Sequence, residues 1–219
     1  VDYSFLPGKK RPALTDYIKN NNIKKVEDIP EDDKLKLLTT TQKKILKYHK
    51  VGKEHFDPEL KNILKNYEWP FYFMDFEFVT QYAPIIKGTN PHQELPFQWS
   101  VHKWDSIEKE LKIEDGSSFL DFAPHDIELK FLESLLKVLG NKGSIFVYNK
   151  TAEEGVLENL KGREICKHFK DEIDSVISRI VDAFPLAKQY FYHPKMRGSF
   201  SIKQVIKAIP TTISYNDEE

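Results

Sequence analysis

Residues 71–79 read Phe71-Tyr72-Phe73-Met74-Asp75-Phe76-Glu77-Phe78-Val79 and follow directly on Trp69-Pro70. Aromatic and aliphatic side chains fill all but two of these positions, which is typical of a β-strand at the centre of a sheet. The two exceptions, Asp75 and Glu77, lie two positions apart, so a strand directs both carboxylates to the same face. We therefore expect a central strand that carries a pair of acids.

The segments before and after this strand differ in kind. Residues 1–68 show helical signals, among them Asp57-Pro58 as N-cap and first helical position, and we expect a small helical N-terminal segment there. After a loop rich in Pro, Gly and Asn, residues 97–104 alternate between polar and apolar side chains with period two. Residues 111–114 are expected to pair beside them as an antiparallel hairpin.

Strands and helices alternate in the rest of the chain. The expected elements are, in order, a helix from Pro124 closed by Gly140 and Gly143, a short strand at 144–148, a pair of helices, a strand at 179–182, and a helix that begins with a capping box of Ser201 and Gln204. This order predicts an α/β fold in which helices flank a mixed β-sheet, with residues 69–219 as one domain.

Composition limits the classes of protein to consider. The chain has 219 residues, with 33 Lys and Arg against 34 Asp and Glu, so bulk charge gives no general attraction to nucleic acid. Its single cysteine, Cys166, excludes an intrachain disulfide and leaves oxygen and imidazole groups as metal ligands. Neither a membrane-spanning stretch nor a targeting signal is recognisable, so we expect a cytoplasmic protein with no membrane partner.

The acid pair is the first candidate site. Asp75 and Glu77 on one face of a buried strand would repel each other, and burying them would be costly unless a divalent cation lay between them. Carboxylate oxygens are hard ligands that suit Mg²⁺ or Mn²⁺. The alternative is that the strand ends here and both acids face water.

A second candidate lies where the predicted strand 144–148 ends. Asn149 follows this strand, and Glu153 comes four residues later at the start of a helix. Ligands of open α/β sheets bind at the carboxyl ends of strands, so Glu153 is expected to point towards an ion held by Asp75 and Glu77. The alternative is that Glu153 only stabilises the helix start through the helix dipole.

Cationic and aromatic side chains are interleaved in residues 188–207. Phosphates require positive charge and unstacked bases require flat faces, so this segment is the best candidate for a single-stranded nucleic-acid track. The alternative is that its aromatic side chains are core and its lysines are solvated. The residues expected to bind substrate are Tyr192, His193, Lys195, Arg197 and Lys203, together with Asn149 and Asp182 at strand ends.

These motifs together resemble the DnaQ-like, or DEDD, superfamily of 3′–5′ exonucleases, which has an RNase H-like fold. The first motif of that superfamily, Asp-x-Glu, is matched by Asp75-Phe76-Glu77. The resemblance is closer to a little-characterised bacterial domain-of-unknown-function branch of the superfamily and extends in register over roughly residues 50–213. The segments that carry it are 69–77, 87–93, 96–98, 143–149, 179–182 and 192–203.

The chain departs from the superfamily pattern at two places. In the second motif, Asn-x-x-Phe-Asp, Ala152 stands for the aromatic residue and Glu153 for the aspartate. The third motif, a helical Tyr-x-x-x-Asp, is not found, and Asp217 in Ser-Tyr-Asn-Asp-Glu-Glu is not assigned to it. The resemblance therefore implies that residues 1–219 belong to a longer protein whose last catalytic helix lies beyond them.

The resemblance implies hydrolysis of DNA or RNA from a 3′ end, with two Mg²⁺ or Mn²⁺ ions held by Asp75, Glu77, Glu153 and a further aspartate. A second interpretation is a catalytically inactive RNase H-like module that binds nucleic acid or protein. A third compares Asp75 and Glu110-Leu111-Lys112 with the Asp…Glu-x-Lys pattern of restriction-type endonucleases. The sequence does not choose between DNA and RNA, and it does not indicate an oligomeric state.

Overall fold

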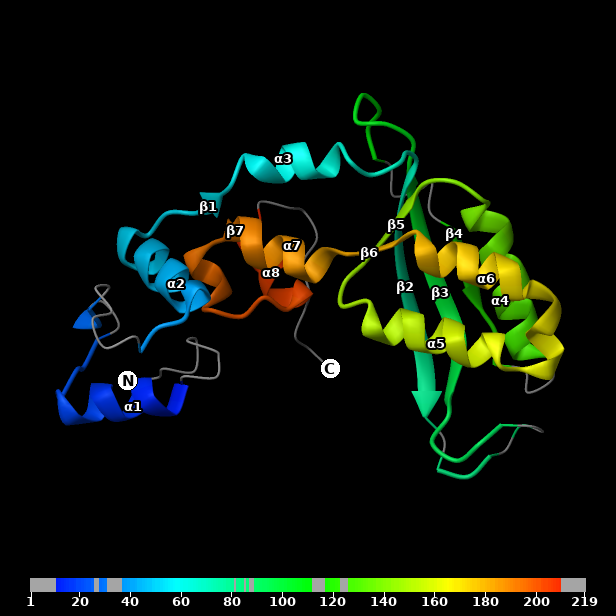
Figure 1. Cartoon of the computed structure of the whole chain (residues 1–219), viewed down its shortest axis with the longest axis horizontal. Helices are drawn as coiled ribbons and strands as arrows, with labels where there is room; N and C mark the ends of the chain where they lie inside the picture. The colour runs from blue at the N-terminus through cyan, green and yellow to red at the C-terminus, as the bar shows by residue number, and fades with distance from the viewer. Residues whose placement is uncertain are drawn as a thin grey trace. The chain divides into compact units, whose positions relative to one another are not determined.

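The protein was analysed as a computed structural model, which describes residues 11–25, 28–30, 37–80, 82–84, 86, 89–111, 117–122 and 126–209. Its contacts divide the chain into two compact units (Figure 1). Unit 1 comprises residues 1–62 and 184–219, and unit 2 comprises residues 63–183. Unit 2 is therefore inserted in the sequence between the two parts of unit 1.

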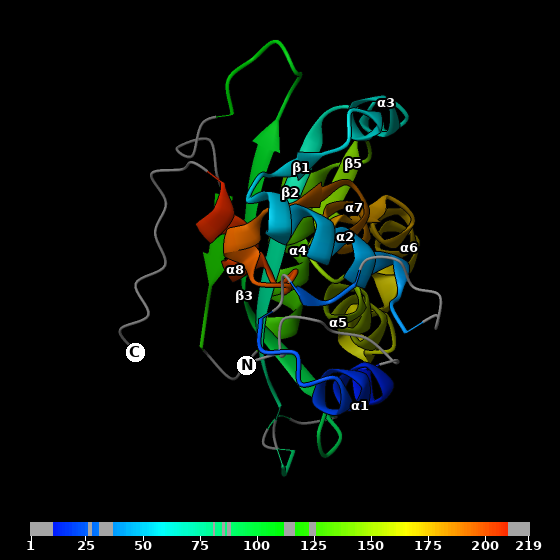
Figure 2. The ribbon, with the colours of Figure 1, turned by 90° about the vertical axis from the view of Figure 1, so that its left-hand side faces the viewer.

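Unit 2 is built on a mixed five-stranded sheet in the order β4-β3-β2-β5-β6. Its strands are β2 (Phe71–Thr80), β3 (Glu94–Trp104), β4 (Ser117–Leu120), β5 (Ser144–Val147) and β6 (Ile180–Asp182). The long strands β2 and β3 pair antiparallel along their length (Figure 2). Strands β5 and β6 run parallel to β2, and β4 runs antiparallel to β3, so β3 alone has the opposite direction.

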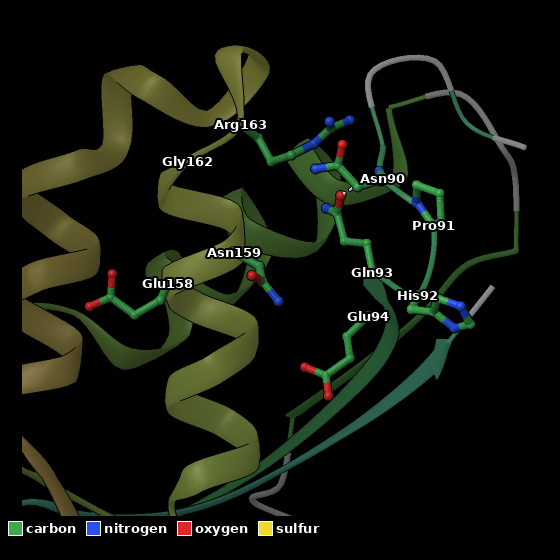
Figure 3. Close-up of a pocket in the computed structure, with 9 residues that line it drawn as sticks. All are labelled: Asn90, Pro91, His92, Gln93, Glu94, Glu158, Asn159, Gly162 and Arg163. Atoms are coloured by element: carbon green, nitrogen blue, oxygen red, sulfur yellow. Dashed lines mark hydrogen bonds between the residues drawn. The ribbon is translucent and has the colours of Figure 1, made fainter. Parts of the chain in front are cut away.

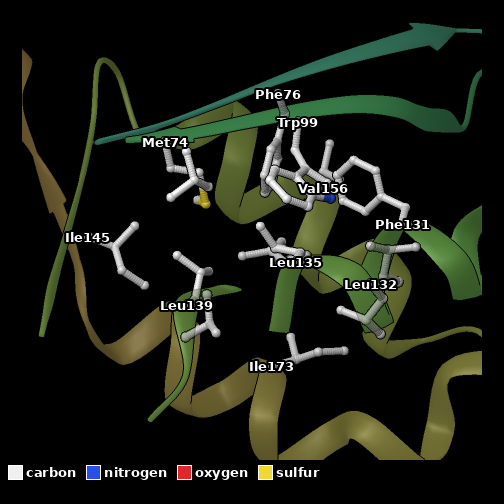
Figure 4. Close-up of a cluster of buried hydrophobic side chains, with 14 of the residues drawn as sticks. Met74, Phe76, Trp99, Phe131, Leu132, Leu135, Leu139, Ile145, Val156 and Ile173 are labelled. Atoms are coloured by element: carbon white, nitrogen blue, oxygen red, sulfur yellow. The ribbon is translucent and has the colours of Figure 1, made fainter. Parts of the chain in front are cut away.

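Helices cover the apolar side of this sheet. They are α4 (Ile127–Leu139), α5 (Thr151–Lys161), the 3-10 helix η3 (Glu164–Phe169) and α6 (Lys170–Ser178). Met74 and Phe76 of β2 join Phe131 and Leu135 of α4 in the buried core (Figure 4). Because side chains alternate along a strand, Asp75 and Glu77 occupy the opposite side of β2 from this core.

Unit 1 is assembled from segments at the two ends of the chain. Its helices are α1 (Arg11–Asn20), α2 (Thr40–Val51), α7 (Ala183–Tyr190), the 3-10 helix η4 (Pro194–Met196) and α8 (Ile202–Ala208), and α3 (Glu59–Leu64) crosses its boundary with unit 2. Strands β1 (His55–Phe56) and β7 (Phe191–Tyr192) pair antiparallel. Lys44 of α2 donates to the carbonyls of Gln189 and Phe191 at 3.2 and 3.4 Å, which ties the two segments together at the end of α7.

The core of unit 1 is separate from that of unit 2. It contains Ile18, Ile45 and Leu46 from the first segment and Tyr192 and Met196 from the second. None of these side chains belongs to the cluster on the sheet. Each unit therefore has a hydrophobic core of its own.

The α/β class, the mixed sheet and its helices confirm the expectation from the sequence. The segment before β2 is not wholly helical, however, because β1 forms there through pairing with β7. The expected division placed residues 184–219 in the same domain as β2, whereas contacts group them with the N-terminal segment.

Of two further local predictions, one extends beyond the described residues and the other is wrong. The strand expected at 111–114 extends into residues outside the described part of the chain, and the strand that pairs with β3 is instead β4. Ser201 is the N-cap of α8, but its side chain makes no capping hydrogen bond there, so the predicted capping box is wrong. At Asp57 the expected cap is present, since its Oδ1 accepts from the Glu59 amide at 3.0 Å.

Candidate acidic site at the carboxyl ends of the strands

The parallel strands bring acidic residues to one edge of the sheet. Phe73 of β2 lies opposite Phe146 of β5, and Val147 of β5 lies opposite Asp182 of β6. Asp75 is two residues beyond Phe73, so it reaches the level at which β5 ends. Since α5 begins just after β5, this edge gathers side chains from three strands and one helix.

Asp75 and Glu77 affect each other electrostatically. Partial burial of the Asp75 carboxyl raises its pKa, and the negative charge of Glu77 raises it further. A hydrogen bond from the Phe76 backbone opposes this increase in the pKa of Asp75. Both residues keep substantial exposed area, so a ligand in solution can reach their side chains. The two acids form a reachable pair of hard oxygen donors.

Glu153 is the buried member of this acidic group. It lies in the first turn of α5 with 4% of its surface exposed. Its Oε2 atom is buried and has no hydrogen-bond partner in the part of the chain that the structure describes. Burial raises the pKa of Glu153 to about 7, and the charges of Asp75 and Asp182 add to the increase. A buried carboxylate of this kind requires a proton or a cation.

The neighbouring Glu154 has a different environment. Its Oε1 is 2.8 Å from Lys150 Nζ, in an ion pair at the start of α5. The two consecutive glutamates are therefore distinct, because Glu154 has a cationic partner and the Oε2 of Glu153 is left for another ligand.

Asp182 shapes the turn between β5 and α5. Its Oδ1 accepts a hydrogen bond of 3.0 Å from the amide of Asn149. Asn149 has a φ of 71°, in the left-handed region that asparagine tolerates better than most residues. Tyr148, which the sequence did not single out, borders this turn, and burial followed by the charge of Asp182 raises its pKa to about 12. Asp182 therefore fixes the turn that leads to Glu153.

The acids are close enough to influence one another without forming a finished coordination shell. In the described residues, no group of three or more His, Cys, Asp or Glu side chains is arranged to hold a metal ion. Their oxygen donors and the orphaned Oε2 of Glu153 suit a hard divalent cation, and the exposed Asp75 and Glu77 are able to turn towards one.

The residues expected to bind a nucleic-acid strand lie in unit 1, apart from Asn149 and Asp182. Tyr192 is fully buried, so the expectation that its ring stacks on a base is corrected to a role in the core. His193 caps η4, with its Nδ1 accepting from the Lys195 amide at 3.0 Å. The side chains of Lys195, Arg197 and Lys203 are exposed. The burial of Tyr192 could not be inferred from a sequence pattern in which cationic and aromatic residues are interleaved.

Glu110 lies near the first residue of β2, away from Asp75. It follows Lys109, whose carbonyl accepts from Trp104 Nε1 at 2.6 Å, and Trp104 pairs with Phe71. Asp75 instead pairs with Ser100, farther along the strands. Lys112 lies outside the described residues. This arrangement does not favour the Asp…Glu-x-Lys interpretation.

None of the described helices is long and apolar enough to cross a membrane.

Comparisons with known proteins bear on the family of the chain. The curated proteins and the solved structures contain no match to the chain. A family model, described as Domain of unknown function (DUF2779), matches residues 72–201, from β2 to the residue before α8. The match covers more than half of the chain, including Asp75, Glu77, Glu153 and Asp182, and the protein therefore belongs to this family.

Proposed function

We propose that this protein is a metal-dependent nuclease with an RNase H-like fold that removes nucleotides from the 3′ end of DNA or RNA. The strand order β4-β3-β2-β5-β6, with β3 alone reversed, is the order expected of that fold. The acids Asp75, Glu77 and Glu153 gather at the carboxyl edge of the parallel strands, where ligands of α/β sheets bind.

The observation that carries the proposal is that Oε2 of Glu153 has no hydrogen-bond partner among the residues that the structure describes. Folding buries this carboxyl next to the charge of Asp75, an arrangement that opposes ionisation at neutral pH. A divalent cation would compensate both charges at once. We therefore assign Asp75, Glu77 and Glu153 as the residues that hold Mg²⁺ or Mn²⁺.

When bound, such ions lower the pKa of an attacking water and stabilise the leaving 3′ oxygen of a phosphodiester. The protein itself holds the acidic side chains in position. Glu153 is held by the first turn of a helix whose approach is fixed by the hydrogen bond between Asp182 and Asn149. Asp75 and Glu77 project from a strand that is paired with β3 at both positions, which limits their displacement.

The test is degradation of oligonucleotides with 3′ overhangs, of both DNA and RNA, with Mn²⁺ or with EDTA. We expect stepwise shortening from the 3′ end that requires Mn²⁺ and falls at least about 100-fold in Asp75→Asn, Glu77→Gln protein. Glu108→Gln, at an exposed position near the end of β3, is the matched control and should leave the rate unchanged.

Two outcomes would contradict the proposal. One is the absence of shortening for both nucleic acids, together with equal Mn²⁺ affinity in the wild type and the double variant. The other is loss of cleavage in Glu110→Gln but not in Glu153→Gln, which would instead establish the restriction-type arrangement.

A binding module without catalysis is the second candidate function. The observation that favours it is that the described acids are not prearranged as a group of three or more metal ligands. It predicts tight binding of oligonucleotides that is insensitive to EDTA and to the Asp75→Asn, Glu77→Gln substitutions.

A further inference from the structure

A polar cavity of about 600 Å³ opens in unit 2 between α5 and the beginning of β3 (Figure 3). Its wall includes Asn90, His92, Gln93 and Glu94 from the β3 side, and Asn159 and Arg163 from the α5 side. A cavity of this volume is within the range that accommodates a small organic ligand. None of the acids assigned above lines it.

Several of its polar side chains are without partners in the described part of the protein. The carboxylate of Glu94 has no ion pair, and the side-chain amides of Asn90 and Asn159 have no hydrogen bond. In Figure 3 the side chains of Glu94 and Asn159 extend into the space between their two elements. The cavity thus offers one acceptor group and two amides to a ligand.

The other charged groups of the cavity are already neutralised. Arg163 donates from Nε and Nη2 to Oε2 of the buried Glu128, at 2.8 and 2.7 Å. Glu158 is 2.7 Å from Lys161 Nζ. Among the described acidic and basic residues that line the cavity, the remaining charge is the negative charge of Glu94. A phosphate group would be repelled, whereas a neutral ligand with N–H donors would be favoured.

A nucleobase with an exocyclic amino group has the chemistry that these side chains recognise. A carboxylate accepts from the amino group of cytosine, and an asparagine amide pairs with the N6 and N7 edge of adenine. Guanine presents an amino donor as well, whereas uracil and thymine have no exocyclic amino group and offer a single ring N–H donor at N3. We propose that this cavity binds an amino-bearing nucleobase, with Glu94 as the acceptor and Asn159 as the second hydrogen-bonding group.

This inference rests on the proposed nuclease function and gives it a basis for substrate selection. Glu153 and Asn159 belong to the same helix, and six residues along an α-helix span about 9 Å. Six residues also turn the helix by about 240°, so a base held at Asn159 would belong to a nucleotide one or more positions away from the phosphate at the acidic site. The enzyme would then prefer strands with C, A or G at that position over strands with U or T.

The test is an NMR titration of the whole chain with cytidine, adenosine, guanosine and uridine in EDTA. We expect the side-chain amide signals of Asn90 and Asn159 to shift with the first three nucleosides, with at least tenfold weaker binding of uridine. Glu94→Gln should weaken binding of the amino-bearing nucleosides at least tenfold, and Glu108→Gln should not.

Asn159→Leu gives an independent check, because Asn159 is exposed and its replacement leaves the core unchanged. It should also weaken binding, with an unchanged melting temperature. Equal shifts with all four nucleosides, shifts that map away from the cavity, or full affinity in well-folded Glu94→Gln protein would overturn the inference. Because EDTA removes the metal and free nucleosides contain no phosphodiester, failure here is distinguishable from failure of the nuclease proposal.

Discussion

At the scale of single residues, the unusual feature is a glutamate that folding moves out of water. Glu153 is buried next to Asp75 and Asp182, and these surroundings raise its pKa from 4.5 to about 7. Between these two values the folded protein binds more protons at this carboxyl than the unfolded protein does. The free energy of unfolding therefore decreases as the pH rises through this interval.

We expect Glu153→Gln to remove this pH dependence. In EDTA the wild type should lose stability between about pH 4.5 and pH 7, and the increase in the pKa of Glu153 corresponds to roughly 3 kcal/mol in total. The variant should lose less stability over that interval and should exceed the wild type above pH 7. Urea unfolding at a series of pH values measures both effects.

Glu154→Gln is the matched control for this measurement. Glu154 is adjacent in sequence but is paired with Lys150, so its removal should not flatten the pH profile. A wild-type profile that is flat from pH 5 to pH 7 would show that Glu153 ionises without a penalty, and would remove the main support for a cation at this position.

At the scale of secondary-structure elements, Arg179 organises the junction between α4 and β5. Its guanidinium donates to the carbonyls of Gly140 and Lys142 at 2.7 and 2.6 Å, and at 3.2 Å to that of Gly143. Gly143 has a φ of 89°, and a Cβ there would lie 2.2 Å from the carbonyl oxygen of Pro70. The turn is tight, and a single side chain satisfies several of its acceptors.

Replacing Arg179 by Lys should therefore destabilise unit 2, although the charge is kept. An ammonium group cannot span carbonyls that the planar guanidinium reaches from two nitrogens. We expect a loss of about 2 kcal/mol in the free energy of unfolding, measured by urea titration. Arg197→Lys, at an exposed position of unit 1, should change it by less than about 0.5 kcal/mol. A similar loss in both variants would indicate that the hydrogen bonds to the turn are not the cause.

The elements that could be predicted are those whose signal is local. The apolar run of β2, the helical stripe of α4 and the short apolar strands β5 and β6 all appear where sequence periodicity places them. Strands β1 and β7 have two residues each and exist only through their pairing with each other. No local pattern reveals a contact between such distant segments.

In the candidate site, too, the residues with a local sequence signal could be predicted and those that depend on distant contacts could not. Asp75 and Glu77 could be identified because alternation in a strand places them on one face. The orphaned Oε2 of Glu153, the role of Asp182 in fixing the turn and the burial of Tyr192 all depend on packing between elements. The cavity beside α5 likewise joins residues from a loop and a helix that are separate in the chain.

At the scale of the whole molecule, the two separate cores should respond separately to mutation. Leu46 is fully buried in the core of unit 1 and Leu135 in the core of unit 2. Replacing either by Ala creates a cavity and should cost about 2–5 kcal/mol locally. Hydrogen exchange read by mass spectrometry should show loss of protection in α2 and α8 for Leu46→Ala, and in α4 and β5 for Leu135→Ala.

Each variant is the control for the other. Equal deprotection of both units by either substitution would show that they unfold as one cooperative body, contrary to the separation of the cores.

The insertion of unit 2 between the two parts of unit 1 has a consequence for synthesis on the ribosome. The chain emerges from its N-terminus, and the first half of unit 1 is translated before β7 and α8, which complete its core. Unit 2, by contrast, has all of its strands and helices once Ala183 has left the exit tunnel. Unit 2, which lies in the middle of the sequence, is therefore expected to fold first. The first segment of unit 1 can complete its core only after the second segment has been synthesised.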